Sequence, residues 1–270
     1  MMNLSLKELF LNSNNYSSKH KKYFDVYEEN FSRYIGKNII FVEIGIFNGG
    51  SLKVWKKYFG PNAKIIGIDI NPECKKFEED GIDVYIGNQS DPKFWDNFFQ
   101  QVGNVDIILD DGGHTNLDQI TSTIKCVNKI NDDGLLMIED THTSYMEPYN
   151  SSKKYSFINF AKKIIDDVNY TFPFGIKKNF DYSLNDHIYS SHFYESIVVF
   201  KVNRKRAIQN ETIENQGKFH AIEDLVKQGN EVNIYHVKKF VNKINFISLR
   251  KITKYLRNKT NNKILRKFFY

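Results

Sequence analysis

Short runs of β-branched and apolar residues alternate with segments of helical length through the middle of the chain. The runs, which we interpret as strands, occupy residues 39–44, 64–69, 83–87, 105–109 and 135–138, and the helical segments occupy 51–58, 72–80, 92–101 and 116–130. Strand–helix alternation predicts a parallel sheet with helices on both faces. Near-continuous apolar runs such as I-I-G-I-D-I agree, because parallel strands are buried on both sides.

The alternation of strand and helical segments stops near the end of this region. Residues 188–193 and 197–202 are two further apolar runs with only three residues between them, too few for a helical crossover. They predict an antiparallel hairpin at one edge of the sheet. Five parallel strands and a terminal antiparallel pair make an α/β, Rossmann-like seven-stranded methyltransferase sheet, whereas a nicotinamide-type Rossmann domain has six parallel strands.

Polar segments flank this core and divide the chain into three regions. Residues 1–37 predict an N-terminal helical cap, in which Tyr23, Tyr27 and Phe31 at i, i+4 and i+8 bury one helix face. Residues 38–203 form the expected α/β domain that contains this sheet. Residues 204–270 are polar and then basic, and we expect appended helices there.

Charge is distributed unevenly. From Lys238 to the C-terminus there are eleven Lys and Arg and no Asp or Glu, so the net charge of +6 leaves −5 on the first 237 residues. The body is therefore not expected to bind nucleic acid, and no nucleic-acid-reading module accompanies the tail. The tail is interpreted first as packing on the body or on another subunit of a homo-oligomer, and second as a contact with an anionic membrane surface.

Cysteine usage and the N-terminus favour a cytoplasmic protein. Cys74 and Cys126 are far apart, which excludes a disulfide scaffold and a thiolate zinc site. The first ten residues carry charges where a signal peptide needs an apolar stretch, and no run approaches the ~18 apolar residues of a membrane span.

Polar residues follow the first three predicted strands, where an open α/β sheet binds its ligands. The first strand runs into E-x-G-x-x-x-G instead of G-x-G-x-x-G, and an acid before the glycine suits a cationic ligand better than a diphosphate. Asp69 ends the second strand, where it can bond a ribose diol. The expected cofactor contacts at these strand ends and at Asp110 are Glu43, Gly45, Asn48, Gly49, Ser51, Asp69, Asn88, Gln89, Ser90 and Asp110. The alternative is that residues 45–50 form only a strand–helix turn.

Acids and a histidine follow the fourth and fifth strands. The strands end in I-L-D-D-G-G-H and M-I-E-D-T-H, which brings Asp110, Asp111 and His114 beside Glu139 and Asp140. Carboxylates this dense repel one another unless a cation is present, and hard oxygen ligands suit Mg²⁺, with Mn²⁺ or Ca²⁺ as alternatives. The competing interpretation is that two of the acids only cap helices.

His114 follows two glycines on a turn. An unperturbed imidazole pKa near ~6.5 suits a general base beside a metal and a hydroxyl substrate, although a structural histidine is the usual interpretation. His142 and His20 are weaker candidates for the base.

Together these residues resemble the class I S-adenosylmethionine-dependent methyltransferases, and more narrowly the metal-dependent sugar O-methyltransferases of macrolide deoxysugars and capsular heptoses. The matching segments are F-V-E-I-G-I-F-N-G-G-S-L-K-V-W, I-I-G-I-D-I, G-N-Q-S-D, I-I-L-D-D-G-G-H, M-I-E-D-T-H-T-S-Y and S-H-F-Y-E-S-I-V-V-F-K, within residues 20–201. Asn88 and Gly113 depart from the family pattern, which usually has Asp and Ser there.

The resemblance implies S-adenosylmethionine and Mg²⁺ as cofactors, with Asp111, Glu139 and Asp140 as metal ligands and His114 as the base. Asp111 and His114 are thus the expected catalytic residues. The implied substrate is a small-molecule or nucleotide-linked sugar, or a glycan of capsule polysaccharide biosynthesis. Residues of the N-terminal helix and of the segments 145–150 and 170–187 are expected to recognise it. The rival functions are a nicotinamide-dependent oxidoreductase and a non-catalytic methyltransferase-like scaffold.

Overall fold

The computed structural model describes residues 4–79, 81–149, 155–169 and 184–218. The chain divides into two units, Met1–Thr212 and Ile213–Tyr270. Of the second unit, residues 213–218 are described, and they belong to no helix or strand. The predicted helices of the basic extension lie almost entirely outside the described residues.

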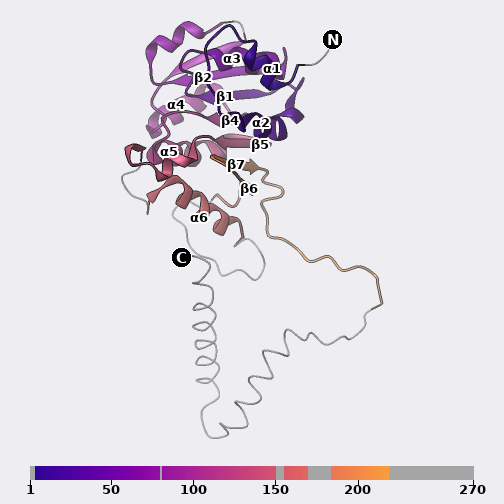
Figure 1. Cartoon of the computed structure of the whole chain (residues 1–270). Coiled ribbons are helices and arrows are strands. Elements are labelled where there is room, and N and C mark those ends of the chain that lie inside the picture. Colours follow the sequence, from indigo (N-terminus) through magenta and orange to yellow (C-terminus); the bar gives the residue numbers. More distant parts are fainter. Residues whose placement is uncertain (1–3, 80, 150–154, 170–183, 219–270) are drawn as a thin grey trace. The chain divides into compact units, whose positions relative to one another are not determined.

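Seven strands form one sheet in the order β3-β2-β1-β4-β5-β7-β6 (Figure 1). The first five are parallel, and β7 pairs antiparallel with both β5 and β6. The predicted methyltransferase sheet is therefore confirmed, with β7 inserted between β5 and the edge strand. The strands are β1 (Ile40–Ile44), β2 (Lys64–Asp69), β3 (Ile82–Ile86), β4 (Val105–Asp110), β5 (Ile130–Ile138), β6 (Ile188–Tyr194) and β7 (Ile197–Val202).

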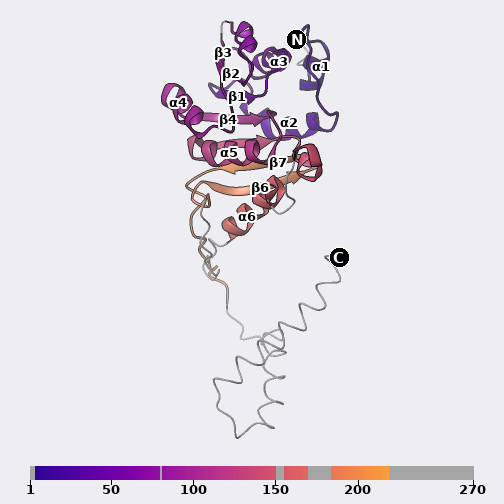
Figure 2. The same ribbon diagram turned by 90° about the vertical axis from the view of Figure 1, so that its left-hand side faces the viewer.

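Helices cover both faces of the sheet, and each face has its own hydrophobic core (Figure 2). One core joins the sheet to α1, α2 and α3, and the other joins it to α4, α5 and α6. Alternate strand residues point into opposite cores, so Phe41 lies in the first and Val42 in the second. The helices are α1 (Leu6–Leu11), α2 (Tyr23–Phe31), α3 (Gly50–Phe59), α4 (Pro92–Val102), α5 (Asn116–Cys126) and α6 (Phe157–Asn169).

The N-terminal region contains the expected helix with a buried aromatic face. Tyr23, Tyr27 and Phe31 of α2 are all buried. The Phe31 ring lies 5.6 Å from Trp55 of α3 and 5.9 Å from Phe41 of β1, both edge-on, which is a favourable aromatic geometry. This packing fixes α2 and the segment before it against the sheet.

Some boundaries differ from the predictions. The helix expected over 72–80 is a 3₁₀ helix, Pro72–Phe77, and the helix expected over 116–130 ends at Cys126. β5 begins at Ile130, not near 135, because Val105 pairs with Ile130 before a register shift that pairs Ile107 with Leu135. Further 3₁₀ turns are Ser32–Tyr34, Val127–Lys129, Thr141–Tyr145 and Glu147–Tyr149.

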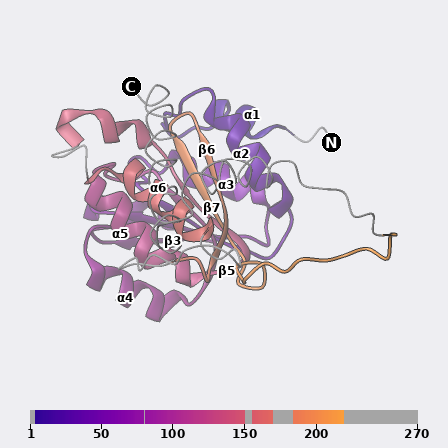
Figure 3. The same ribbon diagram turned by 90° about the horizontal axis from the view of Figure 1, so that it is seen from below.

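α6 is a helix that the sequence interpretation did not include. Its buried residues Phe157, Ala161 and Ile164 follow helical spacing, and that periodicity was the available signal. Figure 3, viewed from below, shows α6 beside the β6–β7 edge of the sheet. Within the described part of the chain, no helix is both long and apolar enough to cross a membrane.

Candidate active site

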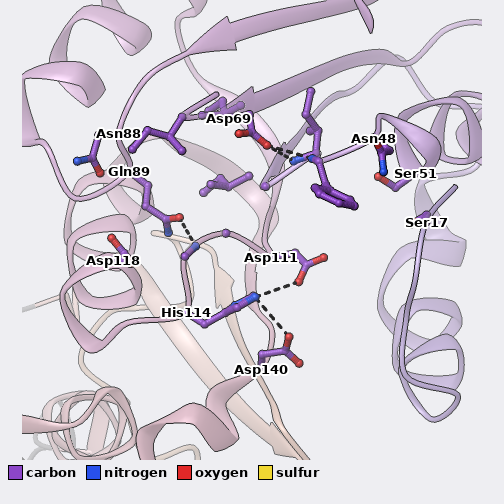
Figure 4. Close-up of a pocket in the computed structure, with 18 of the residues that line it drawn as sticks. Ser17, Asn48, Ser51, Asp69, Asn88, Gln89, Asp111, His114, Asp118 and Asp140 are labelled. Carbon is purple, nitrogen blue, oxygen red and sulfur yellow. Dashed lines mark hydrogen bonds and ion pairs between the residues drawn. The ribbon is translucent and has the colours of Figure 1, made fainter. Parts of the chain in front are cut away.

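A cavity of about 580 Å³ opens at the carboxyl ends of the parallel strands. Loops after all five parallel strands contribute to it, and the segment before α2 adds Tyr16, Ser17 and Ser18 (Figure 4). This is the location that an open α/β sheet offers to ligands. The predicted cofactor contacts that line it are Gly45, Asn48, Ser51, Asp69, Asn88 and Gln89.

The glycine loop after β1 touches the loop after β4. Gly45 has a φ of +85°, and a Cβ there would lie 2.1 Å from the carbonyl oxygen of Asp111. Only glycine allows this close approach, so the glycine motif holds the loop after β1 against the loop after β4. Gly49, also predicted as a cofactor contact, lies outside the cavity lining and has a φ of +66° at the start of α3.

Asp69 faces the cavity from the end of β2. Its Oδ2 accepts hydrogen bonds from the backbone amides of Ile46 and Phe47 at 3.1 and 3.0 Å, and its Oδ1 accepts one from Asn71 at 2.9 Å. These three bonds come from backbone amides, which favour the ionised carboxylate. The same bonds hold the glycine loop in place.

Gln89 connects the loops after β3 and β4. Its amide nitrogen donates to Asp110 at 3.0 Å, and its amide oxygen accepts from the Gly113 amide at 2.8 Å. Asp110 is buried and lies outside the cavity lining, and burial raises the pKa of its carboxyl. Ser90 also lies outside the lining, and its hydroxyl donates to Asn88. Asp110 thus lies behind the cavity wall, and Ser90 is half-buried beside the cavity lining.

Asp111, His114 and Asp140 form a metal-capable group in the same cavity. One ligand atom from each lies within 4.8 Å of the others. His114 Nε2 is 3.5 Å from Asp140 Oδ2 and 3.8 Å from Asp111 Oδ1, and Figure 4 shows the imidazole between the two acids. Among the described residues, His114 Nδ1 is buried without a hydrogen-bond partner.

Two residues of this group have left-handed backbones. His114 has a φ of +56° and Asp140 a φ of +52°. Thr143 Oγ1 donates to the His114 carbonyl at 2.8 Å, and the Tyr23 hydroxyl lies 2.5 Å from Asp140 Oδ1. Strain of this kind costs about 1–3 kcal/mol per residue and concentrates at functional sites.

The side chain of Glu139 does not face the cavity, contrary to the prediction. Its side chain is buried, its Oε1 accepts a hydrogen bond from the Tyr27 hydroxyl, and its Oε2 lies 3.2 Å from Lys19 Nζ. Glu43 is likewise buried outside the cavity lining and accepts a hydrogen bond from Ser51 at 2.6 Å.

Lys19 is a buried residue of the site that the sequence did not predict. Its side chain is 4% exposed, and its ammonium lies 2.5 Å from Asp111 Oδ2 and 3.6 Å from Glu43 Oε1, besides its contact with Glu139. Burial opposes the charge, but these carboxylates raise the pKa of Lys19 well above its ordinary value. No periodicity marks Lys19, because it lies in an irregular segment between α1 and α2.

Comparison with known proteins shows that the chain is similar to methyltransferases. No protein-family model matches the chain. It is 27% identical over 158 residues to 8-demethyl-8-alpha-L-rhamnosyl tetracenomycin-C 2'-O-methyltransferase from Streptomyces olivaceus, covering 55% of this chain and 41% of that one. It is 33% identical over 126 residues to mycinamicin VI 2''-O-methyltransferase from Micromonospora griseorubida, covering 44% and 31%. The chain thus spans well under half the length of these curated relatives.

Solved structures agree on the fold. The MycE methyltransferase from the mycinamycin biosynthetic pathway, in complex with Mg and SAH, superposes with a TM-score of 0.69 at 24% identity, covering 84% of this chain and 60% of that one. The complex that also contains mycinamycin VI gives a TM-score of 0.67, again at 24% identity. The predicted resemblance to sugar O-methyltransferases and the predicted fold are therefore both confirmed.

Proposed function

We propose that the chain is an S-adenosylmethionine-dependent and divalent-metal-dependent O-methyltransferase that acts on a sugar hydroxyl. One observation carries the proposal. The glycine loop and Asp69 line the same cavity as the group of Asp111, His114 and Asp140. A nucleoside-bearing methyl donor and an activated hydroxyl would therefore meet in one enclosed space, as a transfer between them requires.

The donor half of the cavity suits S-adenosylmethionine. Asp69 would bind the ribose diol, and Asn88 and Gln89 would contact the adenine. Glu43 lies behind the glycine loop and would favour the cationic sulfonium through the low-dielectric interior rather than by direct contact. Gly49, Ser90 and Asp110 would shape the loops that bind the donor.

The acceptor half suits a hard divalent ion, Mg²⁺ or Mn²⁺. Asp111 and Asp140 would hold it, since Mg²⁺ is usually bound by one or two carboxylates and retains sites for other oxygens. When bound, the ion lowers the pKa of a coordinated hydroxyl and orients it. The motif resemblance implies that Glu139 is a metal ligand. We assign Glu139 instead to the buried contact with Lys19.

His114 would act as the general base. Its Nε2 lies 3.5 and 3.8 Å from the carboxylate oxygens of Asp140 and Asp111, so a hydroxyl held by these acids would be within its reach. The backbone of His114 is fixed by Thr143, which keeps the imidazole pointing into the cavity. The proton would move from the substrate oxygen to Nε2.

We extend the proposal to a nucleotide-linked sugar or a glycan, such as a capsular heptose, as acceptor. The relatives carry names of enzymes that act on sugar-bearing polyketides. Tyr149 is exposed, and the centroid of its ring lies 6.5 Å from that of the His114 imidazole. An aromatic ring at that place suits the apolar face of a sugar ring.

The test is methyl transfer from labelled S-adenosylmethionine to a panel of nucleotide-linked sugars and sugar-bearing polyketides. We expect turnover with Mg²⁺, its loss on chelation, and a fall of about 10²–10⁴-fold in kcat for His114→Ala, since that is the usual contribution of a general base. His192→Ala, which removes a histidine of the edge strand β6 that contacts Ser190 and lies outside the cavity lining, is the matched control. Full activity of His114→Ala, or turnover unaffected by chelation, would contradict the proposal.

A further inference from the structure

The two carboxylate oxygens of Asp111 face different partners. Oδ2 lies 2.5 Å from the Lys19 ammonium, whereas Oδ1 lies 3.8 Å from His114 Nε2 on the cavity side. Asp111 therefore joins two groups of polar atoms. The inner group surrounds Lys19, and the outer group consists of Asp111 Oδ1, His114 and Asp140.

The inner group is closed to solvent. The side chains of Lys19, Glu43 and Glu139 are 4%, 1% and 1% exposed, and oxygens of Glu43, Glu139 and Asp111 all lie within 3.6 Å of the Lys19 ammonium. Carboxylates buried in this way are costly unless a cation compensates them. Lys19 supplies that cation from within the chain.

This arrangement has the form of a two-cation site. In enzymes with two metal ions, carboxylates bridge ions that lie about 3.5–4 Å apart. Here the bridging residue is Asp111, one of the two positions is occupied by an ammonium, and the other is bounded by the outer group. The ammonium thus stands where a second divalent ion would otherwise bind.

Packing explains why Lys19 stays in this place. It lies four residues before the start of α2, and α2 is fixed by the burial of Tyr23, Tyr27 and Phe31. Tyr27 also donates a hydrogen bond to Glu139, so the helix that positions Lys19 also holds one of its partners. On the other side of Lys19, Tyr16, Ser17 and Ser18 line the cavity.

We propose that Lys19 is a resident cation that occupies the inner half of the acid cluster and thereby restricts the site to one divalent ion, held by the outer half. The inference rests on the metal site of the proposed function. It makes Lys19 a positioning residue, because it acts through Asp111 and Glu139 and lies outside the cavity lining.

The test counts Mn²⁺ ions bound to the full chain, measured as the loss of the free-ion signal in electron paramagnetic resonance. We expect one ion per chain for the wild type, and two for Lys19→Ala, in which the vacated space is lined by three carboxylates. Lys19→Arg keeps the charge and should bind one ion. Lys22→Ala removes a lysine of the same segment whose partner is the exposed Glu195, and it should also bind one.

Folding is monitored by the melting temperature with Mn²⁺ and with a chelator. Lys19→Ala and Lys19→Asn should both melt lower than wild type in chelator and recover with Mn²⁺, because the ion replaces the ammonium. A wild-type chain that binds two ions, a Lys19→Ala chain that binds only one, or Lys19→Ala and Lys19→Asn chains that Mn²⁺ fails to restore would each overturn the inference. If the wild type binds no Mn²⁺, the metal role in the proposed function fails instead.

Discussion

At the scale of single residues, the site depends on backbone conformations that most residues avoid. His114 and Asp140 have φ values of +56° and +52°, and they come from the turns that follow β4 and β5. The sequence predicted that both residues lie at neighbouring strand ends, because acids and histidine follow apolar runs there. It did not predict that Glu139 turns away from the cavity, since that orientation depends on Lys19 and Tyr27, which are more than 110 residues away.

Gly45 provides a test of how closely the two loops must approach. Gly45→Ala should lower the free energy of unfolding by about 1–2 kcal/mol for the left-handed backbone and by about 1–3 kcal/mol more for the overlap with the Asp111 carbonyl. Gly36→Ala is the control, because Gly36 has a similar φ of +75° with no atom within 4 Å of its Cβ position. Urea unfolding of both variants measures the difference, and equal losses would refute the role of the close approach.

At the scale of elements, hydrophobic periodicity predicted the strands of the sheet but not the irregular segments around them. Each predicted strand exists, because buried parallel strands are marked by continuous apolar runs. The start of β5 could not be predicted, since residues 131–133 are polar and join the strand only through a register shift against β4. The segment that carries Lys19 has no periodicity, because tertiary packing alone determines its path.

The edge strand β6 carries a histidine whose charge should affect stability. Burial, and then the nearby Lys201 on β7, lower the pKa of His192 below its usual value of about 6.5. The unfolded chain then binds the proton more tightly than the folded one. The free energy of unfolding should therefore fall as the pH drops below about 6.5, until the folded group is also protonated.

This dependence can be measured by urea unfolding between pH 7.5 and pH 5. His192→Gln should reduce the slope of stability against pH in that window, and Lys201→Gln should reduce it in part. A His192→Gln chain with the wild-type slope would show that other groups cause the dependence.

At the scale of the whole molecule, the described hydrophobic cores end before the basic tail begins. Among the described residues, which end at 218, neither core includes one beyond Val202, and Arg204 forms an ion pair with Asp132 at 2.9 Å. A chain truncated after Thr212 should therefore fold and bind S-adenosylhomocysteine with nearly wild-type affinity. Calorimetric titration and thermal melting measure both properties.

A truncated chain that melts more than about 5 °C lower would show that the tail contributes to stability, since ~1 kcal/mol shifts the melting temperature of a domain this size by about 2–4 °C. Loss of donor binding with an unchanged melting temperature would place part of the donor site in the tail.

The position of β7 also has a consequence for synthesis of the protein. Asp140 follows β5 by two residues, and the outer edge of β5 is paired by β7, which begins 59 residues after β5 ends. At about 5–20 residues per second, the ribosome needs roughly 3–12 s to make that interval. During this time the apolar edge of Leu135, Leu136, Met137 and Ile138 has no partner strand from its own chain. Nascent chains on one messenger would therefore be most prone to associate with each other in this window, which closes when the last hairpin is made.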